Sequence, residues 1–178
     1  MAQNNNKDNR LEQSRRITTV GCIGVIVLLV LIYVIGLAGV KSDLGAKHAR
    51  ATEILARMQS HLDRTPGIFD RMLVFDCGDD AVRAVESYKQ SVGTLKEKAS
   101  FEELESLYRQ LEQTWTEVSA GCAGEMDKEV FIGLKTELEG IQNRYNVEKG
   151  NFAKAAAIFN ETLNQFPATI FNTGYKPL

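Results

Sequence analysis

Histidine and cysteine, the residues that most often bind metals or act as nucleophiles, are scarce in this chain. Its histidines are His48 and His61, and its cysteines are Cys22, Cys77 and Cys122. On one helix the two histidines would lie about 20 Å apart along the axis at about 1.5 Å per residue, too far to share an ion. There is no Glu-x-x-His pair of the kind that builds a di-iron bundle, and no Cys-x-x-Cys pair. The sequence therefore predicts neither a metal site nor a cofactor.

Motifs for acid-base or nucleophilic catalysis are also absent or incomplete. The chain contains no G-x-S-x-G elbow and no phosphate-binding G-x-x-x-x-G-K-[ST] loop. Acidic pairs occur, but on a helical protein such pairs are usually solvated. Asp76, Asp79 and Asp80 together suggest calcium, yet they lack the alternating spacing and the downstream glutamate of a calcium loop. We predict that the chain has no catalytic residues and is not an enzyme, with a hydrolase or metalloenzyme as the remaining alternative.

Cys77 and Cys122 form a candidate disulfide. If the helices that carry them make a hairpin turning between Ala99 and Ser100, the two cysteines lie at about the same distance from the turn along the helix axes, which we call equal height. Equal height is necessary for a bridge, but the Cα atoms must also approach within about 7 Å. Two unbridged thiols remain the alternative. A bridge would place the domain in an oxidising compartment.

The longest apolar stretch, residues 17–40, contains no charged residue. About 20 apolar residues in a helix are needed to cross a hydrocarbon core of about 30 Å. A cleaved signal peptide is the main rival, because basic residues precede the stretch. Apolar regions of signal peptides usually hold only about 7–15 residues, and no clear small-x-small cleavage site appears before this stretch ends. We therefore predict an uncleaved, single-pass membrane anchor.

The anchor divides the chain into a polar tail at residues 1–16, a transmembrane helix at 17–40 and a soluble domain at 41–178. The tail is rich in asparagine and is expected to be disordered. Basic residues are numerically balanced on the two sides of the span, but Arg15 and Arg16 adjoin it directly. This arrangement favours a cytoplasmic amino terminus and an extracytoplasmic domain. The net charge of −2 and the scattered basic residues argue against nucleic acid as a partner.

The soluble domain is predicted to be an antiparallel four-helix bundle with long helices, the first of which continues from the membrane span. Apolar residues recur at spacings of three and four over residues 44–62, 68–95, 104–118 and 131–166. Cys77-Gly78-Asp79-Asp80 predicts an irregularity in the second helix. Ser100 and Glu103 have the spacing of a capping box, which would open the third helix.

Two polar residues, Glu148 and Thr162, interrupt the apolar stripe of the last helix. Polar residues at core positions often fix the register of packed helices. We favour this interpretation or a position at the rim of the core. The alternative is that these residues line a seam that accepts a ligand.

The region from Phe131 onward resembles the carboxy-terminal signature of the bacterial LemA family. The matching segments are Glu137-Leu138-Glu139-Gly140-x-x-Asn143-Arg144, Asn151-Phe152, Phe159-Asn160 and Phe166-Pro167. Pro66, within Asp63-x-x-Pro66, is similar to the family's D-L-I-P motif. This chain departs from the family at Ser60-His61, Gly67 and the region around Cys77, so it resembles a divergent member. The resemblance implies an amino-terminal span followed by a helical bundle, without established enzymatic activity.

These observations lead to one expected function and one alternative. We expect a non-catalytic scaffold or interaction protein of the bacterial envelope, anchored in the cytoplasmic (inner) membrane through residues 17–40. Its protein partner is unidentified, and it could form homo-oligomers. The alternative is an extracytoplasmic sensor of a small molecule or of envelope stress. Residues 1–16 are too short for an output domain, so a sensor would signal through a partner.

Overall fold

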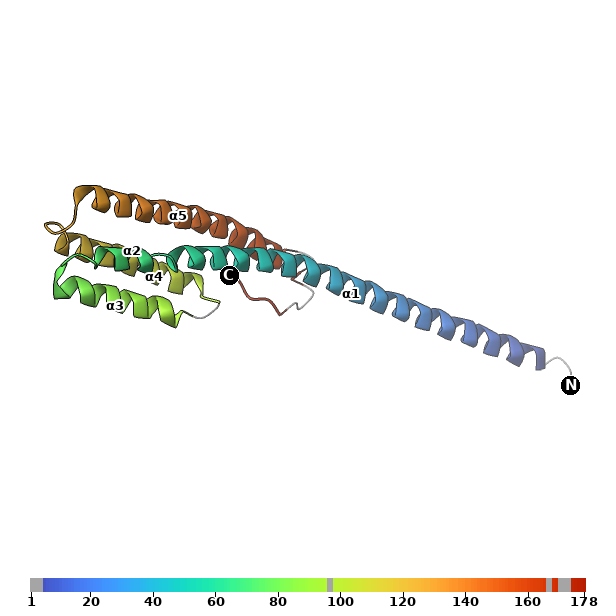
Figure 1. Cartoon of the computed structure of the whole chain (residues 1–178). Coiled ribbons are helices and arrows are strands. Elements are labelled where there is room, and N and C mark those ends of the chain that lie inside the picture. The colour runs from blue at the N-terminus through green and yellow to red at the C-terminus, as the bar shows by residue number, and fades with distance from the viewer. Residues whose placement is uncertain (1–4, 96–97, 166–167, 170–173) are drawn as a thin grey trace. The chain divides into compact units, whose positions relative to one another are not determined.

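The computed structural model describes residues 5–95, 98–165, 168–169 and 174–178, and the regular structure in these ranges is entirely helical. The helices are α1 (Asn5–Leu62), α2 (Pro66–Met72), α3 (Gly78–Thr94), α4 (Phe101–Gly121) and α5 (Lys128–Asn164). They are labelled in Figure 1. The predicted all-α class is confirmed.

The chain divides into two compact units. The first contains the residues up to Gly45 together with Glu161–Pro177, and the second contains Ala46–Asn160 and Leu178. The sequence predicts one soluble domain over residues 41–178. Most of this range, Ala46–Asn160, falls in the second unit, whereas Glu161–Pro177 groups with the first. Helix α1 contributes residues to both units.

Helix α1 begins earlier than the sequence analysis expected. It starts at Asn5, so residues 5–16, expected as part of a disordered tail, are helical. This segment contains neither proline nor glycine. Extending an existing helix by one residue requires much less free energy than nucleating a new helix. Polar composition alone therefore gave the wrong expectation for this segment.

The apolar part of α1 makes little contact with the rest of the chain. The exposed fractions of its large apolar side chains between Ile23 and Ile35 range from 50% to 70%. By length and composition α1 could cross a membrane, and no residue in its most apolar window is buried inside the protein. A core helix of a soluble protein would instead be buried.

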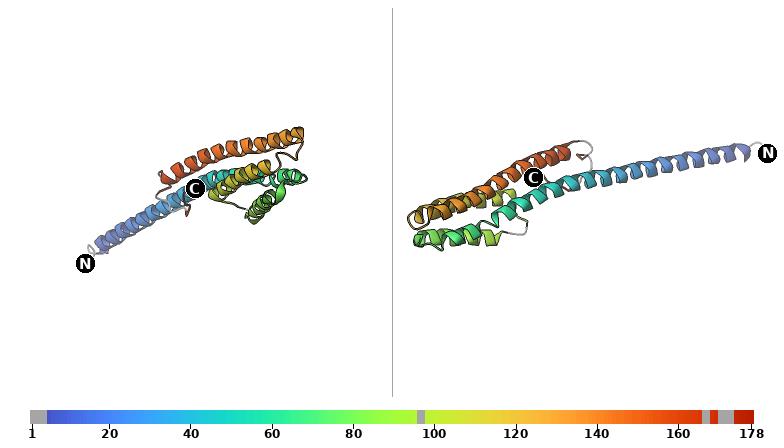
Figure 2. Two further views of the ribbon diagram at one scale, coloured as in Figure 1. Left: turned by 90° about the vertical axis from the view of Figure 1, so that its left-hand side faces the viewer. Right: turned by 45° about the horizontal axis from the view of Figure 1, so that its top comes forward.

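The second unit is an antiparallel bundle, as side-chain contacts between its helices demonstrate. Between α1 and α5, His48 lies against Phe159, and further along α1 Arg57 pairs with Glu148. The contact partner of the later α1 residue comes earlier in α5, so the two helices are antiparallel. Figures 1 and 2 show the carboxy-terminal part of α1 and α5 side by side, and α3 next to α4. Stacked rings join α4 and α5 in the same antiparallel sense, at Phe101–Phe152, Tyr108–Tyr145 and Trp115–Phe131.

The core of this bundle is built from the predicted apolar stripes. In α5 the buried side chains include Leu134, Leu138, Ile141, Tyr145, Phe152, Ala155 and Phe159. These positions recur at spacings of three and four, which places them on one face of a helix. The same spacing in α4 buries Leu104, Leu107, Leu111 and Val118. The apolar period thus identified the faces that pack together.

The second predicted helix is two helices in the structure. Helix α2 ends at Met72 and α3 begins at Gly78, whose φ angle is +80°. A side chain at this position would be strained, because this backbone region favours glycine. The break also changes the helical phase. Ala81 is buried at 2% exposure, whereas Val82, which the continuous stripe had placed inward, is 38% exposed.

The capping box at the start of α4 is confirmed. The backbone N–H of Glu103 donates to Ser100 Oγ over 3.2 Å, and the backbone N–H of Ser100 donates to Glu103 Oε2 over 2.7 Å. These bonds satisfy two backbone donors that the helix end would otherwise leave unpaired. Helices α3 and α4 pack against each other, and Cys77 and Cys122 lie together at one end of this pair.

Candidate functional site

Cys77 and Cys122 are joined by a disulfide, with their Cα atoms 4.3 Å apart. Cys77 immediately precedes α3, and Cys122 immediately follows α4. The bridge therefore closes the hairpin at the end opposite its turn. Both residues are at most 5% exposed. This position is typical of a structural bridge.

The acidic residues considered for calcium do not converge in the structure. Asp79 and Asp80 lie in the first turn of α3, where the helix dipole favours negative charge. Asp80 also forms an ion pair with Arg83. Across the part of the chain that the structure describes, no group of three or more histidine, cysteine, aspartate or glutamate side chains is placed to hold a metal ion.

The two histidines occupy different environments on α1. His48 packs edge-on against Phe159, with ring centroids 5.5 Å apart. His61 has a buried Nδ1 atom without a hydrogen-bond partner among the described residues. Burial lowers the pKa of His61 below its ordinary value, and the charge of Arg64 adds to this effect. A neutral imidazole is therefore favoured at this site.

A groove lies between α1 and α5, and we call it the α1–α5 groove. It has a volume of about 310 Å³. One face of each helix lines it, and the lining residues are Lys47, Arg50, Ile54 and Arg57 from α1 and Asn151, Lys154, Ala155 and Ile158 from α5. Half of these residues are cationic and none is acidic. The buried side chains of Ile54 and Ala155 provide apolar surface beneath the cationic groups.

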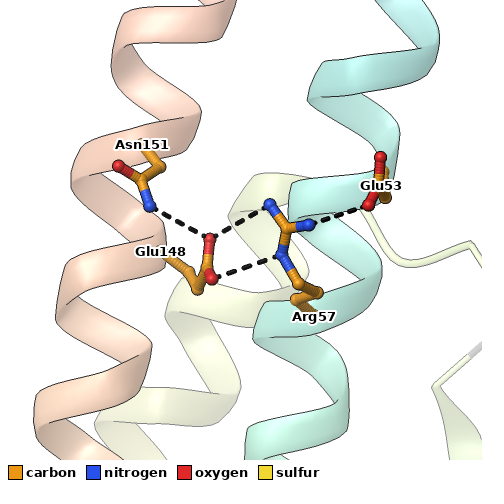
Figure 3. Close-up of polar contacts among 4 residues, drawn as sticks. All are labelled: Glu53, Arg57, Glu148 and Asn151. Carbon is orange, nitrogen blue, oxygen red and sulfur yellow. Dashed lines mark hydrogen bonds and ion pairs between the residues drawn. The ribbon is translucent and has the colours of Figure 1, made fainter.

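At one end of the groove, Arg57 is held by two carboxylates (Figure 3). Its Nη1 lies 2.8 Å from Glu53 Oε1, and its Nε lies 3.2 Å from Glu148 Oε1. Asn151 Nδ2 donates to Glu148 Oε2 over 3.3 Å. Glu148 thus connects α1 to α5, and its role in fixing their register stays a prediction. Thr162, the other polar interruption, is half-buried.

The other cations of the groove are less well neutralised. Arg50 and Lys154 come from opposite helices, are exposed, and form no ion pair with the described residues. Figure 3 shows the amide oxygen of Asn151 pointing away from Glu148, because its nitrogen is turned toward that carboxylate. The groove therefore combines positive charge with a polar amide and an apolar floor. Such a surface suits an anion that carries an organic part.

A second polar cluster joins α4 to α5. Tyr145 Oη donates to Glu105 Oε1 over 2.9 Å, and Lys149 forms an ion pair with the same carboxylate. The ring of Tyr145 stacks on Tyr108 with a centroid distance of 4.5 Å. Burial raises the pKa of Tyr145 above its ordinary value, and the hydrogen bond to Glu105 adds to the shift. The phenol is therefore kept protonated as a hydrogen-bond donor.

A buried hydrogen bond ties the end of α1 to α3. Tyr88 Oη lies 2.6 Å from Thr65 Oγ1, which in turn donates to the backbone carbonyl of Leu62 over 2.7 Å. Both side chains are essentially inaccessible to solvent. Burial raises the pKa of Tyr88 to about 12. This pair satisfies polar groups inside the core and is structural.

The residues that carry the LemA resemblance are spread over the bundle. Pro66 opens α2, whereas Phe152 and Phe159 are buried in the core. Asn160 forms two hydrogen bonds with the backbone of Leu178, of 3.0 and 3.1 Å. Phe166 and Pro167 lie outside the described residues.

The remaining signature residues are on α5. Glu139 Oε1 lies 3.7 Å from Lys135 Nζ. Gly140 is half-buried, and a Cβ atom at this position would have no neighbour within 4 Å. Asn143 and Arg144 are exposed. Asn151 is the signature residue that lines the α1–α5 groove. The signature as a whole therefore does not define a single pocket.

Comparison with known proteins provides no relative. No protein-family model matches the chain, and no curated protein and no solved structure matches it either. The candidate site consequently stands on its geometry alone.

The α1–α5 groove was not predicted from the sequence. Lys47, Arg50 and Arg57 are among the basic residues that follow the apolar stretch and balance those before it. Their spacing places them on one face of α1, which was visible in the sequence. That face becomes a site only because α5 brings Asn151 and Lys154 opposite to it, and the pairing of the two helices required the structure.

Proposed function

We propose that this chain is a membrane-anchored, non-catalytic helical-bundle protein of the LemA type that acts as an interaction or scaffold protein in the bacterial envelope. The observation that carries the proposal is an apolar stretch whose large side chains between Ile23 and Ile35 are 50–70% exposed, and which belongs to the same continuous α1 as the first helix of a bundle. The LemA-like segments in α5 support the family assignment. The positions of the signature residues, mostly in the core or on open surface, favour a structural role over catalysis.

The proposed location is the cytoplasmic membrane of a bacterium, with a single span and the bundle on the extracytoplasmic side. The Cys77–Cys122 bridge supports this side, because disulfides persist in oxidising compartments such as the periplasm. The adjacent Arg15 and Arg16 support a cytoplasmic amino terminus.

The exposed apolar residues at one end of the bundle support a protein partner. Val74 follows α2 and is 80% exposed, and Ile132 near the start of α5 is 50% exposed. A hollow of about 310 Å³ near the connection between α4 and α5 is lined in part by Met126 and Phe131. Apolar side chains of this kind are favoured at the centres of protein interfaces. A second copy of the chain and a different protein are both compatible with this surface.

Thiol labelling in intact cells tests the proposed side of the membrane. In a Cys22→Ala background, only Cys77 and Cys122 can react. We expect no labelling by a membrane-impermeant maleimide until an impermeant reductant is added, and then labelling without permeabilisation of the cytoplasmic membrane. Labelling that requires permeabilisation but no reductant would overturn the proposed side.

A matched control reports on the other side of the span. A chain without its three native cysteines and with Ser14→Cys should be labelled only after permeabilisation. Equal labelling of both chains in intact cells would indicate leaky membranes, and the measurement would be repeated with intact spheroplasts until the control is protected.

Photo-crosslinking tests the proposed interaction role. A photoreactive residue at Val74 or Ile132 should give a discrete crosslinked species in cells, whereas the same residue at the exposed Glu86 should not. Identical patterns from all three positions would contradict a specific interface at the apolar end of the bundle.

The α1–α5 groove favours a second candidate function, a sensor that binds a small molecule and signals through a partner. A scaffold would give the same crosslinks with or without ligand, whereas a sensor would lose or gain them. Repeating the crosslinking after substitution of groove residues would therefore separate the two functions.

A further inference from the structure

The α1–α5 groove brings four cationic side chains together on one hollow of the second unit. Lys47, Arg50 and Arg57 line it from α1, and Lys154 lines it from α5. The two carboxylates nearby, Glu53 and Glu148, are both engaged with Arg57. The positive charge of Arg50 and Lys154 is left without an ion-pair partner among the described residues.

The arrangement of these groups differs from a simple solvated face. Long cationic side chains often cover apolar surface while their charged ends remain in water. Here, however, cations from two antiparallel helices converge on one hollow, and the guanidinium at its end is fixed by two ion pairs. A preorganised cation loses less conformational entropy when it binds an anion.

The charge and the volume of the groove indicate the class of ligand. A phosphomonoester carries about 1.5–2 negative charges at neutral pH, so it can use more than one cation, whereas a carboxylate carries a single charge. The volume of about 310 Å³ corresponds to about ten water molecules at about 30 Å³ each, more than a bare phosphate fills. The apolar floor at Ile54 and Ala155 would contact the organic part of the ligand.

We propose that the α1–α5 groove binds the phosphate group of a small organic phosphate, with Arg50 and Lys154 contacting the phosphate oxygens and Arg57 fixing the end of the site. This binding site goes beyond the proposed scaffold function and does not depend on the LemA assignment. The phosphate belongs either to a soluble monoester or to phosphatidic acid, a phospholipid whose head group is also a phosphomonoester, because both present the same chemistry to the groove.

Binding measurements on the full chain test the proposal. In the first arm, the chain is placed in nanodiscs of phosphatidylcholine and titrated calorimetrically with glycerol phosphate. In the second arm, native mass spectrometry measures the retention of phosphatidic acid by chains taken from mixed nanodiscs. The variant Arg50→Gln with Lys154→Gln removes both unpaired cations. The matched control, Lys98→Gln with Arg109→Gln, removes the same charge from exposed positions that do not line the groove.

The two arms distinguish the sources of phosphate. Binding of glycerol phosphate that weakens at least tenfold in the groove variant, and less than twofold in the control, supports a soluble ester. Retention of phosphatidic acid with the same dependence on the variants supports a lipid head group. Far-UV circular dichroism and the Cys77–Cys122 bridge check that each variant is folded.

Three results would overturn the proposal. The first is no binding in either arm, and the second is an equal loss in the groove variant and the control, which would indicate an effect of overall charge. The third is equally tight binding of glycerate, because a carboxylate would then suffice. None of these results bears on membrane anchoring or sidedness, so the proposed function could stand while the phosphate site fails.

Discussion

Glu148 interrupts an apolar stripe, and its contacts explain why a carboxylate is tolerated there. It accepts hydrogen bonds from Arg57 and Asn151, so its oxygens are satisfied at the edge of the core. The side chain of Glu148 is 17% exposed and that of Arg57 is 46% exposed. Ion pairs with this much solvent contact contribute about 0–1 kcal/mol. The pair therefore aligns α1 with α5 more than it stabilises the fold.

His61 should make the stability of the bundle depend on pH. Its pKa in the folded protein is lowered by burial and by the nearby Arg64, Arg144 and Arg57, while Glu148 acts in the opposite direction. The folded state then binds fewer protons than the unfolded state near this site. The contribution of His61 to stability is complete above its ordinary pKa of 6.5 and is lost as the pH falls toward the lowered value.

Thermal unfolding of the full chain in detergent, followed by circular dichroism between about pH 7.5 and about pH 5, measures this dependence. The Tm of the wild type should fall relative to that of His61→Gln as the pH decreases. The raised pKa of Asp63 acts with the opposite sign, but it is present in both proteins and cancels in the difference. Parallel pH profiles for the two proteins would contradict the expected role of His61.

At the scale of the elements, the junction of α3 and α4 depends on a close approach at Gly121. A Cβ atom at this position would lie 2.4 Å from the backbone carbonyl oxygen of Cys77 and 3.3 Å from the Cβ of Ala81. A backbone atom cannot move aside as a flexible side chain does. Gly121→Ala should therefore destabilise the bundle by about 1–3 kcal/mol, the usual cost of overpacking.

Gly133 provides the matched control for that substitution. It lies within α5, and nothing is within 4 Å of its Cβ position. Gly133→Ala should stabilise the protein by up to about 1 kcal/mol, because alanine has the higher helix propensity. Urea unfolding of the two variants should thus give shifts of opposite sign. A stabilising shift for Gly121→Ala would show that the α3–α4 contact is looser than described.

The disulfide should contribute strongly to the stability of the same hairpin. It links residues separated by 45 positions in the sequence. The loss of chain entropy in the unfolded state corresponds to about 4 kcal/mol for a loop of this length. A reductant should lower the Tm of the wild type and of Cys22→Ala, but not that of Cys77→Ala with Cys122→Ala. A wild-type Tm that does not respond to complete reduction would contradict this contribution.

The elements show which structural features local sequence patterns can predict. The stripes of α4 and α5 and the capping box at Ser100 were predictable, because they depend on helical spacing and neighbouring residues. The interruption at Gly78 was anticipated, but the change of phase that buries Ala81 instead of Val82 depends on a backbone angle. The α1–α5 groove was not predicted, because it depends on which faces of distant helices pack together.

At the scale of the whole molecule, the two units make different demands on their surroundings. The second unit buries its own apolar stripes and closes its hairpin with a disulfide. The large apolar side chains of α1 between Ile23 and Ile35 are instead 50–70% exposed. Apolar surface left exposed over this length is favourable only in contact with lipid or another protein. The described residues that carry the LemA resemblance lie in this second unit, so membrane attachment must be tested separately.

A charge placed in the apolar part of α1 tests its contact with lipid. Val30 is 55% exposed, and Val30→Arg should oppose membrane insertion by about 2.5–3.5 kcal/mol if this position lies near the middle of a bilayer. Carbonate extraction of cell membranes measures the outcome, with the variant moving toward the soluble fraction. Val74→Arg is the matched control, because it places the same side chain at a position that is 80% exposed but outside the apolar stretch. An identical distribution of Val30→Arg and Val74→Arg between the two fractions would contradict contact of this position with lipid.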